Sequence, residues 1–343
     1  MAGINGSMAH LSDSIFTTSI AVYALAMVAY TAEYAFGRRG RIADTAVLAA
    51  PARELVGAGG TVLTKDTPSD IPSVVEIDPT TGKRSFADRA GWLAVALTVF
   101  GALLHTGSIA VRAIAVDAVP WSNMYEFASV AGLVGVVAFL GVLWKAPSIR
   151  HLGSFILLPV VLMMFLAGTV LYSKAQPLVP ALQSYWLAIH VTLVSIAEGA
   201  LMTSAVLTAL YLVKVRHDRL SGKPGYVPGR VGTLASRLPA ADVLDKTAYR
   251  IVAFAFPLYT VAIICGSIWA EAAWGRYWGW DPKETWAFIV WVIYACYLHA
   301  RATAGFKGKG AAWVNLAGFG AITFNFLVVN IVVSGLHSYA GLS

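Results

Sequence analysis

A tryptophan-rich polar loop carries the most unusual residues of this sequence. It lies between two long apolar runs and reads Trp274-Gly-Arg-Tyr-Trp278-Gly-Trp280-Asp281-Pro-Lys283-Glu284-Thr-Trp286. Five of the eleven tryptophans fall between Trp269 and Trp286. Anchoring of indoles at a bilayer surface explains part of this cluster but not its density. A shelf of indole faces edged by charged groups is the sharper hypothesis, and it suits a large, flat, apolar ligand with charged edges.

Two histidines fall on the same side of the predicted bundle as this loop. His190 lies about a turn and a half into an apolar run, and His337 follows the last one. Neutral imidazoles on both sides of a planar macrocycle commonly hold the iron of a haem. The haem propionates need cationic or polar partners, for which the candidates are Arg276, Lys283 and Arg112. Taken together, these residues predict a haem site at the outer surface.

Three further polar residues fall inside apolar runs. His299 follows Trp286 by 13 residues, which places it about 20 Å deeper along a helix. His105 and Glu198 also lie within predicted spans. Ionisable groups inside a membrane are costly and usually functional, so a second, deeper ligand position is expected. The sequence does not identify a partner for Glu198.

Polar residues also recur along the last apolar run and at one outer rim. Thr323, Asn330 and His337 are seven residues apart, with Ser334 four beyond Asn330, so they predict one polar stripe on a helix that faces the bundle. Arg112 and Glu126 flank a short outer connection, where they either pair with each other or contact a ligand.

The composition identifies a membrane protein. Hydrophobic residues make up 58% of the 343 residues and charged residues only 13%, about half their usual share in soluble domains. The two cysteines, Cys265 and Cys296, lie in apolar runs without a Cys-x-x-Cys arrangement. A thiol relay, a structural zinc site and an iron–sulfur cluster are therefore not expected.

Eight apolar stretches are long enough to cross a hydrocarbon core, which takes about 20 helical residues. They cover residues 14–36, 90–111, 123–144, 152–172, 185–213, 247–269, 286–304 and 312–335. The predicted fold class is all-α, a polytopic membrane helix bundle of about eight transmembrane helices with the N- and C-termini outside. The first stretch lacks a preceding basic segment and a following cleavage site, so we expect a retained span.

The distribution of basic residues orients the bundle. With the N-terminus outside, 21 of the 25 Lys and Arg residues lie on or beside the inner connections and 4 on the outer side. This split follows the positive-inside rule. The net charge of +7 thus reflects topology, and we expect contact with membrane lipid and no binding of nucleic acid.

Three regions follow from this topology. Residues 1–36 form an outer tail and the first span, residues 37–89 an inner loop, and residues 90–343 a membrane core with an inner loop at 214–246 and the outer tryptophan-rich loop at 270–285. Both inner loops are rich in Gly and Pro and are expected to be loosely ordered. The sequence shows no internal repeat and no inverted halves, which weakens a secondary-transporter interpretation.

The pattern Trp274-Gly-x-x-Trp278-x-Trp280-Asp281-x-Lys283-Glu284-x-Trp286 resembles the WWD signature of haem-handling proteins. Its setting, from about Trp92 to the C-terminus, resembles the CcsA/ResC family, the integral-membrane subunit of the system II cytochrome c synthase, a member of which is labelled CcsB in some bacteria. The resemblance includes Pro120-x-x-Asn123-x-Tyr125-Glu126, the two outer histidines and Leu298-His299-Ala-Arg301.

This resemblance implies a role in cytochrome c-type biogenesis. His190 and His337 would be the outer axial ligands of haem iron, His299 would ligate haem within the membrane, and the WWD loop would hold the ring of haem b. The chain would move haem outward and present it to the Cys-x-x-Cys-His segment of an apocytochrome c. It would be a subunit of a haem lyase complex and would supply no nucleophile itself.

The family also implies a partner and a location. A membrane partner of the ResB/CcsB type would supply the other intramembrane histidine and a large outer domain, and His105 is a weaker candidate for that ligand. The expected location is the bacterial plasma membrane, or the thylakoid membrane if the gene is plastid-encoded. The alternatives are haem delivery of the CcmC or CcmF type, a haem exporter, and a transporter for a substrate other than haem.

Overall fold

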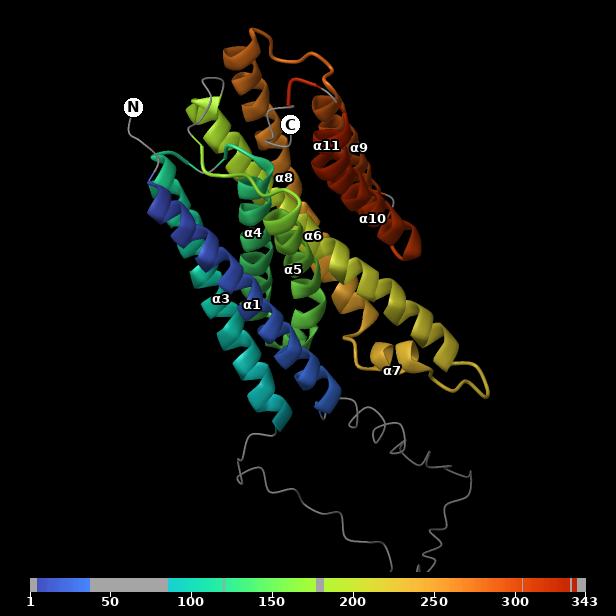
Figure 1. Ribbon diagram of the computed structural model, residues 1–343. Coiled ribbons are helices and arrows are strands. Elements are labelled where there is room, and N and C mark those ends of the chain that lie inside the picture. Colours follow the sequence, from blue (N-terminus) through green and yellow to red (C-terminus); the bar gives the residue numbers. More distant parts are fainter. Residues whose placement is uncertain are drawn as a thin grey trace, which may run out of the picture.

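The computed structural model describes residues 5–37, 86–119, 121–176, 182–303, 305–333 and 335–337, and no strand occurs among them. The chain is an all-α bundle (Figure 1). Its elements are α1 (Gly6–Phe36), α3 (Phe86–Val116), α4 (Met124–Lys145), η1 (Pro147–Leu152), α5 (Gly153–Thr169), α6 (Tyr185–Ser221), α7 (Arg230–Ser236), α8 (Ala241–Trp274), α9 (Pro282–Thr303), α10 (Lys309–Phe324), η3 (Asn325–Val329) and α11 (Asn330–Val332).

The helices support a multi-pass membrane protein. Within the described residues, 7 segments are both long enough and apolar enough to cross a membrane. Each overlaps one predicted span. The remaining predicted span, 286–304, corresponds to α9, a helix of 22 residues. Its mean hydropathy is reduced because it carries Trp286, Trp291, Tyr294, Tyr297, His299 and Arg301.

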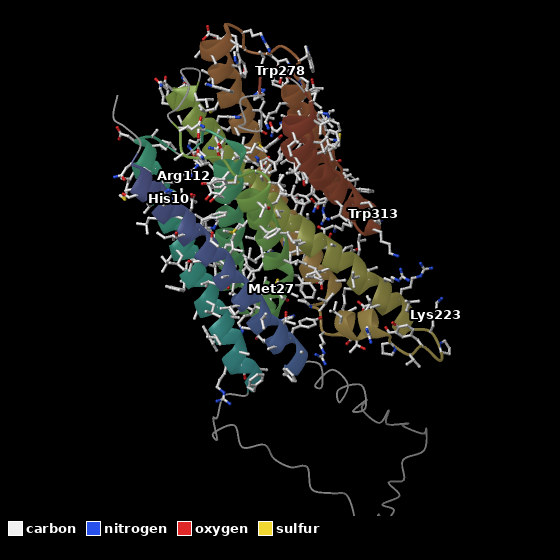
Figure 2. All side chains as sticks on the ribbon, in the orientation of Figure 1. His10, Met27, Arg112, Lys223, Trp278 and Trp313 are labelled. Atoms are coloured by element: carbon white, nitrogen blue, oxygen red, sulfur yellow. The ribbon has the colours of Figure 1, made fainter. Side chains whose placement is uncertain are left out.

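The two ends of the bundle differ in the residues they present. Figure 2 shows His10, Arg112 and Trp278 at one end and Lys223 at the other. The start of α1 and the segment after α11 lie at the same end of the bundle as the end of α8 and the loop that follows it (Figure 1), in agreement with the predicted alternation of spans. The extreme termini, residues 1–4 and 338–343, are outside the described residues.

The helices pack in two groups, each around its own core. In the first, α1 lies along α3 and packs on α5, and α4 packs on α5, with the buried side chains of Tyr23, Tyr30 and Phe139 among them. In the second, α6 lies along α8 and α9 packs on α10, around Tyr259 and Tyr294. Burial of such large aromatic side chains supplies much of the packing free energy.

Close contact between α4 and α6 joins the two groups. A Cβ atom added at Gly199 would lie 2.8 Å from the backbone nitrogen of Gly135 and 3.0 Å from the carbonyl oxygen of Ala131. Small residues allow membrane helices to approach this closely, because dispersion contacts between backbones then replace lipid contacts.

One prediction about the inner connections is wrong, and another falls outside the described residues. The connection 214–246 was expected to be loosely ordered, but α6 continues to Ser221, α7 covers Arg230–Ser236 and α8 starts at Ala241. Helices α6 and α8, with 37 and 34 residues, extend past membrane length. The Gly and Pro residues of 222–229 and Pro239 lie in the short breaks on either side of α7. Of the inner loop 37–89, residues 38–85 lie outside the described residues and 86–89 belong to α3.

The contact at Gly199 predicts an opposite response of two glycines. Gly199→Ala should lower the stability of the purified protein by about 1–3 kcal/mol through overpacking. Gly141→Ala on α4, where nothing lies within 4 Å, should be neutral or raise it by about 0.5–1 kcal/mol. Thermal unfolding in detergent, followed by tryptophan fluorescence, measures both. Equal melting temperatures for the two variants would contradict the close packing of α4 on α6.

Candidate functional site

The tryptophan-rich loop is a sharp connection between α8 and α9. Helix α8 ends at Trp274, and Gly275 then adopts a left-handed conformation with φ of 70° while its N–H donates to the carbonyl oxygen of Glu271 at 2.8 Å. Glycine suits this position because it lacks a Cβ atom. Trp280 also has a positive φ, 59°, and its side chain is 64% exposed. The loop therefore ends in a strained turn directly before Asp281.

The carboxylate of Glu284 closes the loop from inside. It accepts hydrogen bonds from the backbone N–H groups of Gly279 at 2.8 Å and Asp281 at 3.1 Å, as a glutamate near the start of a helix commonly does. The guanidinium of Arg276 lies 3.4 Å from the same carboxylate and 6.0 Å from the centroid of the Trp274 ring. Arg276, a candidate propionate partner, is thus already paired with an anion.

Asp281 connects the loop to the segment that follows α11. Its carboxylate accepts the backbone N–H of Leu336 at 2.9 Å and lies 2.9 Å from Nδ1 of His337. The backbone N–H of Lys283 also donates to it, at 3.4 Å. Asp281 was expected only to edge the indole shelf. It also positions His337, one of the two candidate iron ligands, which lies 56 residues later in the sequence.

These contacts define the protonation of His337. Hydrogen bonding to His337 is the main cause that lowers the pKa of Asp281 to about 2, so the carboxyl is ionised at neutral pH. Burial lowers the pKa of His337 below its ordinary value, although Asp281 opposes this shift. A neutral imidazole next to a carboxylate places its proton on Nδ1, so Nε2 is the nitrogen with a lone pair for a metal.

His190 is held in the same way by a carbonyl group. Its Nδ1 lies 2.7 Å from the carbonyl oxygen of Ala262 on α8. A carbonyl oxygen only accepts, so Nδ1 carries the proton and Nε2 carries the lone pair. The ring lies against Gly266, where an added Cβ atom would come within 2.6 Å of it. Helix α8 therefore fixes both the tautomer and the position of His190.

Trp269 contacts both imidazoles. Its ring is nearly parallel to that of His190, with centroids 6.4 Å apart, and meets the ring of His337 edge-on at 6.0 Å. Trp274 also meets His337 edge-on, at 5.0 Å. The two histidines thus share an aromatic wall, although they come from α6 and from the segment after α11.

A cavity with about 1150 Å³ of empty space, including its mouth, lies beside this wall. Helices α4, α6, α8 and α9, the loop and η3 all contribute to its lining. Six of the predicted site residues line it: His190, Trp274, Trp278, Lys283, Glu284 and His337.

Other predicted site residues act outside the lining or at its rim. The Trp286 ring packs on Phe324 with centroids 4.2 Å apart, which joins α9 to α10. Trp280 contacts Trp278 and Phe288 edge-on, at 5.8 and 6.0 Å. The aromatic shelf is therefore divided between the cavity wall and the packing of the adjoining helices.

The two deeper histidines lie in different surroundings. His299 is exposed on α9, on the inner side of the tryptophan-rich loop. His105 is fully buried in the first helix group, where its Nε2 lies 2.9 Å from the hydroxyl of Ser129 and its ring contacts Phe16 and Tyr23. Neither of them belongs to the outer cavity wall formed by Trp269 and Trp274.

The predicted polar stripe on the last span is wrong as a single helical face. Helix α10 passes into a π-helical turn, η3, and the helix ends at Val332, so His337 lies in a separate turn. The π turn directs Asn325 and Asn330 into the cavity lining. Such turns often occur at functional sites, and a seven-residue spacing read as α-helix misses them.

Arg112 and Glu126 pair with each other at the outer rim, which is one of the two alternatives predicted for them. Arg112 Nε donates to Glu126 at 3.0 Å, and the same guanidinium pairs with Asp13 at 3.3 Å. The arginine and the glutamate are almost fully buried. The pair therefore ties α1, α3 and α4 together, and Arg112 is committed to this network.

Comparison with known proteins identifies the chain. A sequence model of the family described as "Cytochrome C assembly protein" matches residues 121–337. The cytochrome c biogenesis protein CcsA of Gloeobacter violaceus is 35% identical over 283 residues, which cover 69% of this chain and 83% of that protein. The CcsA of Trieres chinensis is 37% identical over 247 residues, covering 65% and 78%. That of Synechococcus sp. strain JA-3-3Ab is 38% identical over 209 residues, covering 48% and 61%.

Fold and comparisons together define a multi-pass membrane protein with a role in cytochrome c biogenesis. Within that class, the chain belongs to the CcsA family. The matched region, 121–337, starts just before α4 and ends at His337. It therefore contains the whole outer cavity wall.

The Asp281 contacts predict a pH-dependent contribution to stability. Asp281→Asn should destabilise the protein by about 1.5–3 kcal/mol at pH 6, because the hydrogen bonds that Leu336, His337 and Lys283 make to a charged acceptor are weakened. The pKa of Asp281 is depressed from 3.8 to about 2. This contribution is therefore complete above pH 4 and is lost as the pH falls toward 2.

Thermal unfolding in detergent between pH 6 and pH 3 measures the effect. The difference between wild type and Asp281→Asn should shrink as the pH falls. Asp242→Asn is the matched control, since Asp242 forms an exposed pair with Lys246 of the kind that contributes little. A difference that stays constant over this pH range would refute an ionised Asp281 bonded to His337.

Proposed function

We propose that the outer cavity binds haem b as a substrate and presents it for covalent attachment to an apocytochrome c. The observation that carries this proposal is the pair His190 and His337. Both line one cavity, and in both Nδ1 is bonded to an acceptor, at 2.7 and 2.9 Å. Each imidazole is therefore prepared to ligate iron through Nε2, as second-shell acceptors prepare metal-binding histidines elsewhere.

The remaining lining suits the porphyrin ring. Indole faces from Trp269, Trp274 and Trp278 provide flat apolar surface. Ligation of iron by two imidazoles stabilises the bound haem and helps to control its oxidation state. The role of the tryptophan-rich loop is to support the ring, while the iron contacts belong to His190 and His337.

The chemistry of attachment requires no nucleophile from this chain. Each thiol of a Cys-x-x-Cys-His segment adds across one haem vinyl group: a carbon–sulfur bond forms, the thiol proton goes to the other vinyl carbon, and no electrons are gained or lost. The protein contributes orientation of the vinyl edge toward the acceptor. The histidine of the acceptor then replaces one imidazole of the cavity, which releases the product.

His299 fits an earlier step in the same process. It is exposed on α9, the helix that corresponds to the predicted span 286–304, and an imidazole exposed at membrane depth is costly. We propose that it ligates haem on the way to the outer cavity and that a ResB/CcsB-type membrane partner provides the second ligand. Two sites on one chain then hold haem in succession.

Absorption spectroscopy tests the haem assignment. The full-length protein, purified in detergent after expression in haem-sufficient cells, should show a Soret band. His190→Gly with His337→Gly should reduce the band strongly, and added imidazole should restore part of it by filling the vacated ligand positions. His10→Gly on α1 is the control and should leave the band unchanged. A band unaffected by the double substitution would overturn the proposal.

Co-expression tests the synthase function. Cells that contain this chain, a ResB-type partner and an apocytochrome c should produce cytochrome with covalently bound haem, detected by haem staining after denaturing electrophoresis. Trp278→Ala should lower the yield by about tenfold or more, because the ring loses a wall of its site. Haem that reaches the outer side without covalent attachment would instead favour an exporter.

A further inference from the structure

The inner part of the outer cavity is polar, although the surrounding bundle is apolar. Four side chains line it, and we refer to them as the polar floor: Glu198, Lys283, Asn325 and Asn330. Glu198 follows His190 by eight residues on α6, which places it about 12 Å deeper. Lys283 comes from the start of α9, Asn325 from the π turn η3 and Asn330 from the start of α11. Four elements thus contribute polar side chains to one cavity inside the membrane bundle.

The two cations near the cavity, Arg276 and Lys283, have different kinds of partner. Arg276 is paired with Glu284 at 3.4 Å, and Glu284 is bonded to the loop backbone as well. Lys283 instead donates to a neutral group, the Oδ1 atom of Asn330, at 2.8 Å. Glu198 supplies a carboxyl group to the lining of the same cavity. Lys283 is therefore a cation of the lining whose side-chain hydrogen bond goes to a neutral group.

Asn325 adds an independent sign of a ligand. Its side chain is 6% exposed, lines the cavity, and has a buried amide oxygen with no hydrogen-bond partner among the described residues. Buried polar groups are normally bonded. The amide can turn either its oxygen or its NH₂ group toward the cavity, so it can donate to an anionic oxygen. The NH₂ group of Asn330 already donates to the carbonyl oxygen of Phe326 at 2.6 Å. Lys283 and Asn325 are therefore the cation and the amide donor of the kind that a carboxylate group needs.

We propose that the polar floor receives the carboxylate side chains of the ligand, and that Glu198 competes with them for Lys283. This inference rests on the proposed haem function. The haem propionates project from one edge of the ring and the vinyl groups from the opposite edge. With the propionates on the floor, the vinyl edge faces the mouth, where an acceptor polypeptide has access.

Competition by Glu198 has a clear physical basis. A ligand with two carboxylates brings two negative charges to a place that already contains one cation and one carboxyl group. In a weakly polar interior, like charges at short range repel strongly. Glu198 therefore lowers the affinity of the cavity for the propionates. A site that transfers its ligand to another protein must not bind that ligand too tightly.

A comparison of two porphyrins tests the inference. The purified full-length protein in detergent is titrated with haem and with haem dimethyl ester, whose propionates carry no charge, and binding is followed by the Soret shift. Glu198→Gln should bind haem about tenfold tighter and Lys283→Met about tenfold weaker. Both variants should bind the ester within about twofold of wild type. Glu271→Gln, an exposed carboxylate on α8, is the control and should change neither affinity.

The outcomes separate this inference from the proposed function. Equal effects of the substitutions on haem and on the ester would overturn the carboxylate site alone, since the floor would not sense the propionates. Weaker haem binding by Glu198→Gln would overturn the competition between Glu198 and the ligand. A wild-type protein that binds neither porphyrin would overturn the haem function and this inference together.

Discussion

The hydrogen bond between Asp281 and His337 is the interaction on which the outer site depends. The same carboxylate also accepts the backbone N–H of Leu336, so Asp281 attaches two adjacent residues of the segment after α11 to the tryptophan-rich loop. The bond closes the cavity wall and selects the tautomer of the imidazole. One carboxylate thus links the geometry of the loop to the chemistry of a residue 56 positions away.

Most of the helix arrangement follows from the sequence, because the lipid environment requires long apolar helices and penalises every other backbone conformation. The seven segments with sufficient hydropathy and the aromatic helix α9 all start within about eight residues of their predicted positions. The prediction failed in the connection 214–246, which lies outside the membrane, where this constraint no longer applies. Helices α6 and α8 are longer than a membrane span and α7 lies between them, so the Gly and Pro residues of this connection mark short turns and not one long loop.

The site was predictable in its residue types and not in its contacts. His190, His337 and the tryptophans are unusual residues for their depth, and this made them candidates. Their partners are ordinary groups: the carbonyl oxygen of Ala262 and a carboxylate in a loop already rich in charges. No local pattern encodes such pairs, since they arise only when distant segments pack. The π turn at η3 escaped detection for a related reason, because it changes the helical register without a distinctive sequence.

Helix α8 has a mechanical role that follows from its length. Its 34 residues extend over about 51 Å, and its groups hold two different parts of the molecule. Near the inner end, Asp245 forms two hydrogen bonds with Arg301 of α9, at 2.7 and 2.8 Å. Further along, Ala262 and Gly266 hold the His190 ring. Pro257 lies inside the helix between these two points, and a proline there removes a backbone hydrogen bond and favours a bend. A shift of α8 at its inner end would therefore reach the imidazole at the opposite surface through a helix that can bend at one known position.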